Sequence, residues 1–72
     1  MVNVIRLRNA LEKCEISYED AARAIGVNRS TFYRRVQREG SKFTVEEVEK
    51  LSTLLRLSSQ EMQAIFFDRE LA

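Results

Sequence analysis

The sequence contains no histidine, no proline and no tryptophan, and it has a single cysteine. Without histidine, the commonest general base at neutral pH is missing, and a zinc site would need Cys14 and carboxylates alone, which is exceptional. One cysteine cannot form an internal disulfide, so a reducing cytoplasm is the expected compartment. The absence of proline, with only two glycines in the chain, favours an all-α fold with few sharp turns.

Long hydrophobic runs are also missing. The longest apolar run is Ala64–Phe67, which is far too short for a signal-peptide core or a membrane span. The composition is 44% hydrophobic and 32% charged, as in an ordinary folded protein. We therefore expect one soluble domain over residues 1–72, near the lower size at which a single core is stable unaided.

Charge is unevenly distributed, although the net charge is only +1. Residues 1–42 carry nine Lys or Arg against five Asp or Glu, which gives +4, whereas residues 43–72 carry three against six, which gives −3. The first part therefore suits a polyanion. The sequence pI of about 7.9 is nevertheless low for a dedicated nucleic-acid binder, for which a pI above about 9 is usual.

Apolar spacing and capping signals predict five short helices. Leu7, Leu11 and Cys14 recur at helical spacing, which predicts a helix over 4–14 with Cys14 packed on its apolar side. Three later segments carry a hydroxyl followed three residues on by an acid, the signature of a helix start. They are Ser17-x-x-Asp20, Thr44-x-x-Glu47 and Ser58-x-x-Glu61.

Glycine and asparagine set the remaining helix boundaries. Gly26 is expected to end a helix over 18–25, and Asn28 to cap the next helix over 29–38, which ends near Gly40. The last two helices are expected to start after Thr44 and Ser58. Their expected inward residues are Val45, Val48, Leu51, Leu54 and Leu55 in the first, and Met62, Ile65 and Phe66 in the second. The result is a compact bundle of five short helices.

The helix over 29–38 has one apolar side and one polar side. At 100° per residue, Phe32 and Val36 mark a buried face, and the opposite arc carries Tyr33, Gln37, Ser30, Arg34 and Arg38. Asn28 and Arg29 project from the helix start, where the dipole favours an anion. The preceding helix offers small residues for close packing, namely Ala21, Ala22 and Ala24. Two helices joined by a three-residue turn with glycine form a helix-turn-helix.

Residues 17–38 resemble the helix-turn-helix of the Cro/CI repressor superfamily. Ala22 occupies the position of the small residue in its first helix, Gly26 that of the turn glycine, and Phe32 the buried position of its second, recognition helix. Val27 follows the glycine as in that family. One departure is Arg35, where many relatives have an apolar residue, and we expect Val36 to take over the packing.

The resemblance extends beyond this motif. "STFYRR" followed by "FTVEEVEKLSTLL" and "EMQAIFF" is similar to small regulators of temperate phages, and specifically to the modulator-of-repression proteins of lactococcal phages. This resemblance implies a phage-encoded protein in the cytoplasm of a bacterial host. It also implies a CI-type repressor as the partner in a lytic–lysogenic switch.

The recognition helix and its cap provide the candidate binding surface, which is for DNA or for a protein partner. Its residues are Asn28, Arg29, Ser30, Tyr33, Arg34, Gln37 and Arg38. The alternative is a merely solvated polar face. A local excess of arginine favours DNA. The low net charge, with Glu19 and Asp20 near the expected phosphate backbone, argues against strong independent binding.

The hypothesis favoured by the sequence is a modulator that binds the CI-type repressor through this face, with operator DNA bound weakly or with the partner's help. A Cro-like repressor that binds operator DNA as a dimer is the alternative. A third is a plain interaction module whose helix-turn-helix shape is inherited but unused. No nucleophile–base pair or phosphate loop is present in the sequence, so we expect no enzyme activity, cofactor, metal or small-molecule substrate. The run Ile65-Phe66-Phe67 cannot place all its side chains on one face, so one aromatic is expected to be partly exposed.

Overall fold

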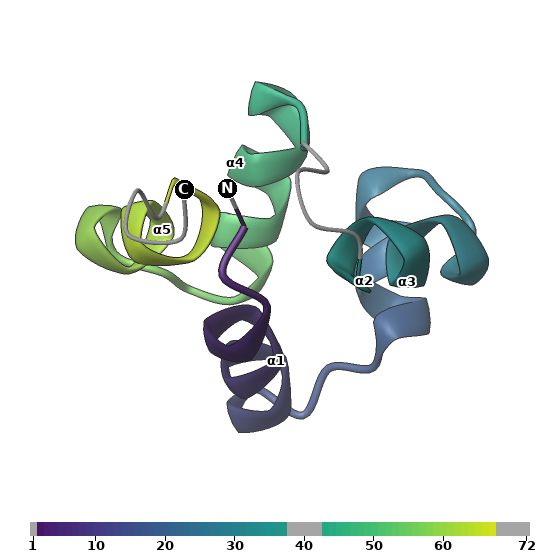
Figure 1. The fold of residues 1–72 in the computed structure, drawn as a ribbon, viewed down its shortest axis with the longest axis horizontal. Coiled ribbons are helices and arrows are strands. Elements are labelled where there is room, and N and C mark those ends of the chain that lie inside the picture. The colour runs from purple at the N-terminus through teal and green to yellow at the C-terminus, as the bar shows by residue number, and fades with distance from the viewer. Residues whose placement is uncertain (1, 38–42, 68–72) are drawn as a thin grey trace.

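The computed structural model describes residues 2–37 and 43–67, and these residues form five helices and no strand (Figure 1). The helices are α1 (Val4–Lys13), α2 (Tyr18–Ile25), α3 (Arg29–Gln37), α4 (Val45–Leu54) and α5 (Ser59–Phe66). This architecture confirms the all-α prediction and its helix order. Two predicted features, Arg38 as the last residue of the third helix and Gly40 as its end signal, lie outside the described residues.

The predicted start signals form at all three positions. The hydroxyl oxygens of Ser17, Thr44 and Ser58 each accept a hydrogen bond of 3.1 Å from the backbone N–H three residues on. Glu47 and Glu61 complete the capping boxes, because their carboxylates accept the cap's own N–H at 2.8 and 3.0 Å. Asp20 does not make this second bond in α2, as its shorter side chain predicts.

Three helices end at or just before a residue with positive φ, but only one of these residues is a glycine. Gly26 ends α2 in the left-handed conformation with φ of 80°, as predicted. Glu15 and Arg56 adopt the same region just beyond α1 and α4, with φ of 55° and 54°. Neither residue is a glycine, so these two ends carry backbone strain that the sequence pattern does not reveal.

Helix α4 lies between two groups of helices (Figure 1). On one side α2 packs against both α3 and α4, and on the other α5 packs against α1 and α4. The start of the described chain is joined to α5, because the backbone N–H of Asn3 donates to the carbonyl of Ile65 at 2.6 Å. Helices α2 and α3 therefore form one end of the molecule, supported by α4.

The core is built from the predicted apolar faces. Phe32, Val36, Leu7 and Leu51 are fully buried, and Ala21 and Ala22 let α3 approach α2 closely. An aromatic chain crosses this core. Phe43 contacts both Phe32 and Phe66, with ring centroids 5.9 and 5.8 Å apart.

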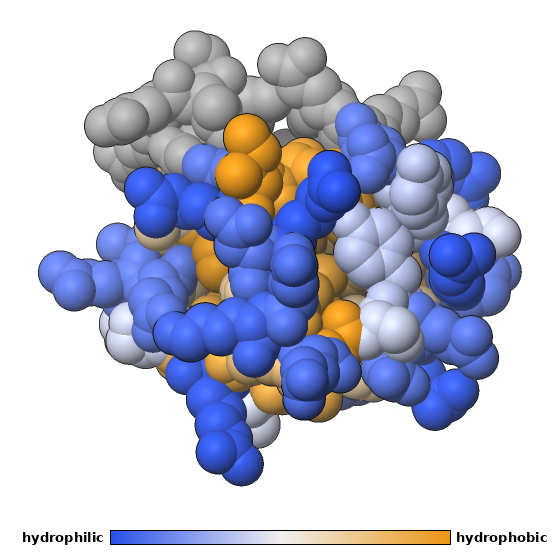
Figure 2. Space-filling model, turned by 90° about the horizontal axis from the view of Figure 1, so that it is seen from below, coloured by the Kyte–Doolittle hydropathy of each residue, from blue (hydrophilic) through white to orange (hydrophobic). Residues whose placement is uncertain are grey.

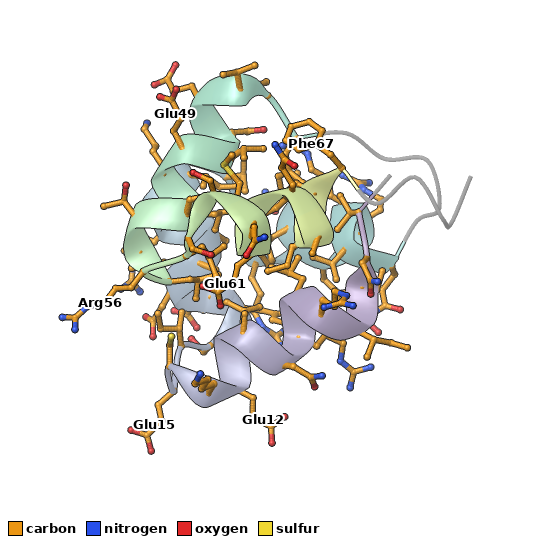
Figure 3. All side chains as sticks on the ribbon, turned by 90° about the vertical axis from the view of Figure 1, so that its left-hand side faces the viewer. Glu12, Glu15, Glu49, Arg56, Glu61 and Phe67 are labelled. Atoms are coloured by element: carbon orange, nitrogen blue, oxygen red, sulfur yellow. The ribbon has the colours of Figure 1, made fainter. Side chains whose placement is uncertain are left out.

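Three side chains test the predictions at the edge of the core. Val45 was expected to point inward but is 73% exposed, because it is the first residue of α4 and lies at the end of the helix's apolar stripe. Cys14 was expected to pack on the apolar side but is exposed at the C-cap of α1, where its thiol donates to the Leu55 carbonyl at 3.6 Å. Phe67 is 53% exposed while Ile65 and Phe66 are buried, which confirms that prediction (Figure 3).

Candidate functional site

The turn between α2 and α3 is closed by short hydrogen bonds. The N–H of Val27 donates to the Ala22 carbonyl at 3.0 Å, and that of Gly26 to the Arg23 carbonyl at 3.2 Å. The Asn28 side chain then caps α3, because its Oδ1 accepts the Thr31 N–H at 2.7 Å. Since α3 also buries Phe32 between these elements, the orientation of its exposed face is determined by its packing.

Helix α3 presents two rows of exposed side chains at i, i+4 spacing. One row is Ser30 and Arg34, and the other is Arg29, Tyr33 and Gln37. Each of these side chains is exposed, and Tyr33 is 52% exposed although it is aromatic. The predicted site residues therefore lie on one side of α3, except Arg38, which lies outside the described residues. Asn28 is also exposed, but its carbonyl oxygen is used by the cap.

A hollow of about 580 Å³ lies beside the second row, between α3 and α1. Arg29, Tyr33 and Gln37 line one wall, and Arg8 of α1 lines the other. The remaining lining residues come from α1, the following loop and the start of α2: Leu11, Glu12, Ile16, Ser17, Tyr18 and Glu19. The sequence analysis missed Arg8, because nothing local in the sequence indicates that α1 lies beside α3.

Tyr18 joins the core to this exposed surface. Its ring meets Phe32 edge to face with centroids 5.5 Å apart, and it lies tilted against Tyr33 at 6.0 Å. Tyr18 is half-buried, so its role here is packing.

Arg35 does not belong to the exposed rows. Its Nη1 lies 2.8 Å from both carboxylate oxygens of Glu47, and the two side chains are only 30% and 13% exposed. The sequence pattern predicts that Glu47 lies with Glu46 and Glu49 on the solvated outer face of its helix, but the structure places it against α3, so for Glu47 this prediction is wrong. Val36 is fully buried, which confirms that it takes over the packing next to Arg35.

The environment of Glu47 also shifts its acidity. Burial by itself raises the pKa of Glu47, but the backbone N–H of Thr44 and the guanidinium of Arg35 together lower the pKa by more. The net result is a pKa below the ordinary value of 4.5. Glu47 is therefore ionised at neutral pH and neutralises Arg35.

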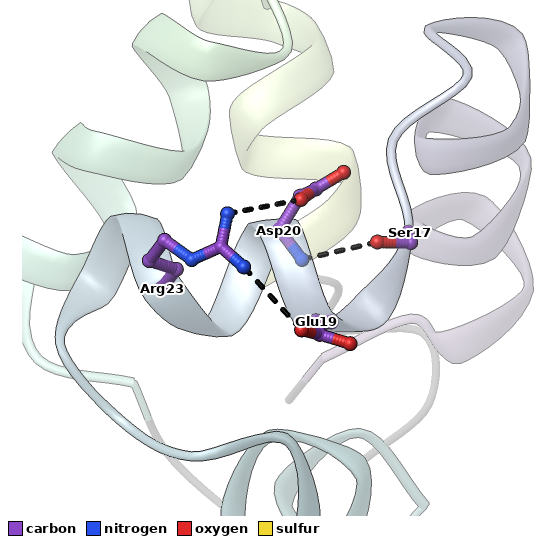
Figure 4. A network of polar contacts seen from close by, with 4 residues as sticks. All are labelled: Ser17, Glu19, Asp20 and Arg23. Carbon is purple, nitrogen blue, oxygen red and sulfur yellow. Dashed lines mark hydrogen bonds and ion pairs between the residues drawn. The ribbon is translucent and has the colours of Figure 1, made fainter.

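The acids at the start of α2 are paired with Arg23 (Figure 4). One guanidinium nitrogen of Arg23 lies 3.3 Å from Glu19 and the other lies 3.4 Å from Asp20. All three side chains are more than half exposed, so these pairs contribute little to stability. They do halve the local negative charge, because one cation lies between two carboxylates.

The side of the molecule that contains α1 is largely polar. Figure 2 shows charged and polar side chains spread over most of this face, with apolar residues visible between them.

No helix in the described part of the chain is both long enough and apolar enough to span a membrane.

Comparison with known families identifies this architecture. Residues 6–56 match the family described as the antitoxin Xre-like helix-turn-helix domain, a span that runs from α1 to the end of α4. The chain belongs to this family. Neither the characterised proteins nor the solved structures gave a match.

Family membership supports the coarser part of the sequence interpretation. An Xre-like helix-turn-helix domain is characteristic of DNA-binding transcription regulation, and α2 and α3 form the motif. The family is typically non-enzymatic. The match also covers Arg8, Tyr18 and the whole of α3, so the surface described above lies within the shared domain.

Proposed function

We propose that this protein is a transcription regulator that binds duplex DNA through the exposed face of α3. The observation that carries this proposal is the row of Ser30 and Arg34 beside that of Arg29 and Tyr33, on a helix whose opposite face is buried. In helix-turn-helix proteins the second helix enters the major groove, and its first turns reach base edges. Within the described part of the chain, Arg29 and Arg34 have no carboxylate at ion-pair distance, whereas Arg23 and Arg35 do.

The side chains suit distinct contacts on DNA. Arg34 can donate two hydrogen bonds to a guanine edge or pair with a phosphate, and Gln37 can pair with adenine. Arg29 lies at the first position of α3, where the helix dipole also attracts a phosphate. Asn28 keeps its amide N–H groups for a contact, since its oxygen caps the helix. Ser30, Tyr33 and Arg38 complete the proposed surface.

Repulsion from Glu19 and Asp20 is weaker than their count in the sequence implies. Arg23 neutralises one of the two charges, and Ser17 holds the helix start beside them (Figure 4). The start of α2 can therefore approach a phosphate backbone with a local charge of about −1 rather than −2. This pairing favours direct DNA binding more than the sequence alone does.

The finer hypothesis is a phage-encoded modulator that contacts a CI-type repressor through the same face and binds DNA weakly alone. It is supported by the half-exposed ring of Tyr33 beside arginines, because Tyr and Arg are enriched at the centres of protein interfaces. The low net charge of +1 also favours a protein partner over DNA alone. A Cro-like repressor that binds its operator as a dimer remains the alternative.

The test begins with DNA alone. The purified protein would be incubated with a pool of randomised duplexes, bound molecules would be recovered and amplified, and enrichment of a motif would be scored. Enrichment with salt-sensitive affinity supports a Cro-like regulator. Failure to bind any duplex at tens of micromolar, where non-specific binding is normally seen, would overturn the DNA proposal.

The protein partner needs a separate measurement without DNA. The protein would be mixed with the N-terminal domain of a CI-type repressor from the same genome, and the mass of the complex would be measured by chromatography with light scattering. A discrete complex that Tyr33→Ala abolishes supports the modulator hypothesis. Elution as two free proteins, together with tight operator binding by this chain alone, contradicts it.

A further inference from the structure

We propose that Glu47 and Arg35 form a positioning pair that holds α3 against the first turn of α4, and that Arg35 is thereby withdrawn from the DNA-contacting surface. This inference rests in part on the proposed function, because it divides the arginines of α3 into contacting and positioning residues. Arg34 and Arg35 are adjacent in sequence, but the structure gives them different surroundings.

The carboxylate of Glu47 is held from two sides. The carboxylate accepts a hydrogen bond from the backbone N–H of Thr44 at 2.8 Å, and the backbone N–H of Glu47 donates to the Thr44 hydroxyl at 3.1 Å. The Glu47 side chain is therefore anchored to the start of α4. The guanidinium of Arg35 then reaches both of its oxygens at 2.8 Å. Because the carboxylate is already held by the capping box, it provides a fixed point for α3 rather than a mobile surface partner.

Packing around Arg35 restricts the guanidinium further. Its Cζ lies 5.8 Å from the centre of the Phe43 ring, a distance at which a cation and an aromatic face attract each other. That ring in turn contacts Phe32 of α3 and Phe66 of α5. Arg35 therefore links α3 to both the carboxylate and the aromatic core, and only 30% of its side chain meets solvent.

Glu61 provides a matched comparison within the same molecule. It occupies the same third position of a capping box, at the start of α5, and makes the same two hydrogen bonds with Ser58. No arginine lies at ion-pair distance from Glu61 among the described residues. Its exposed side chain lies between α5 and α1, where it lines a shallow hollow with Lys13 (Figure 3). Any effect that Glu47→Gln has beyond Glu61→Gln therefore reports on Arg35.

Local amide exchange tests the positioning role. Glu47→Gln and Glu61→Gln both keep the capping box, since Gln also serves at this position. We expect Glu47→Gln and Arg35→Gln to speed hydrogen exchange of the α3 amides by about tenfold relative to the α1 and α5 amides, because each loses a charge-assisted bond. Glu61→Gln should leave the α3 amides unchanged. Unchanged rates, or an equal rise in every helix, in the Glu47 and Arg35 variants would overturn the proposal.

The dependence of DNA affinity on salt tests the division of the arginines. With a random-sequence duplex of about 30 base pairs, loss of one phosphate contact lowers the slope of log affinity against log salt by about 0.9. We expect this loss for Arg34→Gln and no change of slope for Arg35→Gln. An equal fall in both variants would show that Arg35 contacts phosphate and would overturn the proposal.

Two further comparisons keep the outcome decisive. Arg35→Lys retains the positive charge beside Glu47, whereas Arg35→Gln removes it. The α3 amides should therefore exchange more slowly in Arg35→Lys than in Arg35→Gln. Equal exchange rates in the two variants would contradict a charge-based pair. If the unsubstituted protein binds no duplex, the proposed function fails, but the exchange measurement still decides whether the pair positions α3.

Discussion

The ring of Tyr18 contacts two consecutive residues of α3, one on its buried side and one on its exposed side. Its centroid lies 5.5 Å from that of Phe32, which is fully buried, and 6.0 Å from that of Tyr33, which is half exposed. The first contact belongs to the core and the second to the candidate binding surface. Consequently, substitutions at neighbouring positions should separate stability from binding.

Phe32→Ala is expected to destabilise the fold strongly. Removing a fully buried aromatic costs about 3–5 kcal/mol in unfolding free energy, a large part of the stability of a small domain. Tyr33→Ala should cost much less, because that ring is half exposed. Urea unfolding followed by circular dichroism measures both values. Similar losses for the two variants would contradict the assigned faces of α3.

Arg34→Ala is expected to weaken duplex binding without altering the fold. The loss of one phosphate or base contact costs about 1–3 kcal/mol, or about five- to 150-fold in affinity. Arg6→Ala is the matched control, because Arg6 lies on the side of α1 next to α5. Fluorescence anisotropy with the selected duplex measures the affinity of both variants. Equal affinities would show that Arg34 does not contact the DNA.

Gly26→Ala is expected to destabilise the turn through backbone strain alone. A Cβ at this position would meet no atom within 4 Å, but the φ of 80° is unfavourable for a residue with a side chain. The expected cost is about 1 kcal/mol. Gly26→Asn should cost less, since asparagine tolerates this conformation better. Thermal unfolding of the two variants provides the comparison, and a neutral Gly26→Ala would refute the strain argument.

Glu15→Gly and Arg56→Gly are expected to stabilise the protein or leave its stability unchanged. Both residues hold a positive φ at a helix end, which glycine adopts without the Cβ clash. The gain from relieved strain, about 1 kcal/mol, is offset in part by the greater freedom of glycine in the unfolded chain. The urea midpoint measures the balance. Glu12→Gly, inside α1, is the control and should destabilise by about 1 kcal/mol.

Acid should weaken the fold through Glu47. The pKa of Glu47 is lower in the folded than in the unfolded protein. Its contribution to the free energy of unfolding is therefore fully present above pH 4.5, the ordinary pKa, and disappears as the pH falls through the lowered pKa. Glu47→Gln should therefore reduce the loss of stability between about pH 7 and about pH 3. Urea unfolding across this range measures the effect, and an unchanged pH dependence would contradict the assigned pairing.

The helix boundaries could be predicted from the sequence because they depend on local interactions. Ser17, Thr44 and Ser58 mark helix starts because each hydroxyl bonds a backbone N–H only three residues away. Gly26 marks the turn because its own backbone must adopt a positive φ. The two faces of α3 follow from helical periodicity, so the sequence alone predicts that Phe32 is buried and that Tyr33 is exposed.

Tertiary structure decided the features that join distant segments. The pairing of Arg35 with Glu47 requires α3 and α4 to be placed against each other, and the position of Arg8 beside α3 requires the packing of α1. The contact between the Cys14 thiol and the Leu55 carbonyl spans 41 residues for the same reason. Interactions within one helical turn are encoded by residues next to one another, whereas these depend on how whole helices pack, and that is a property of the complete core.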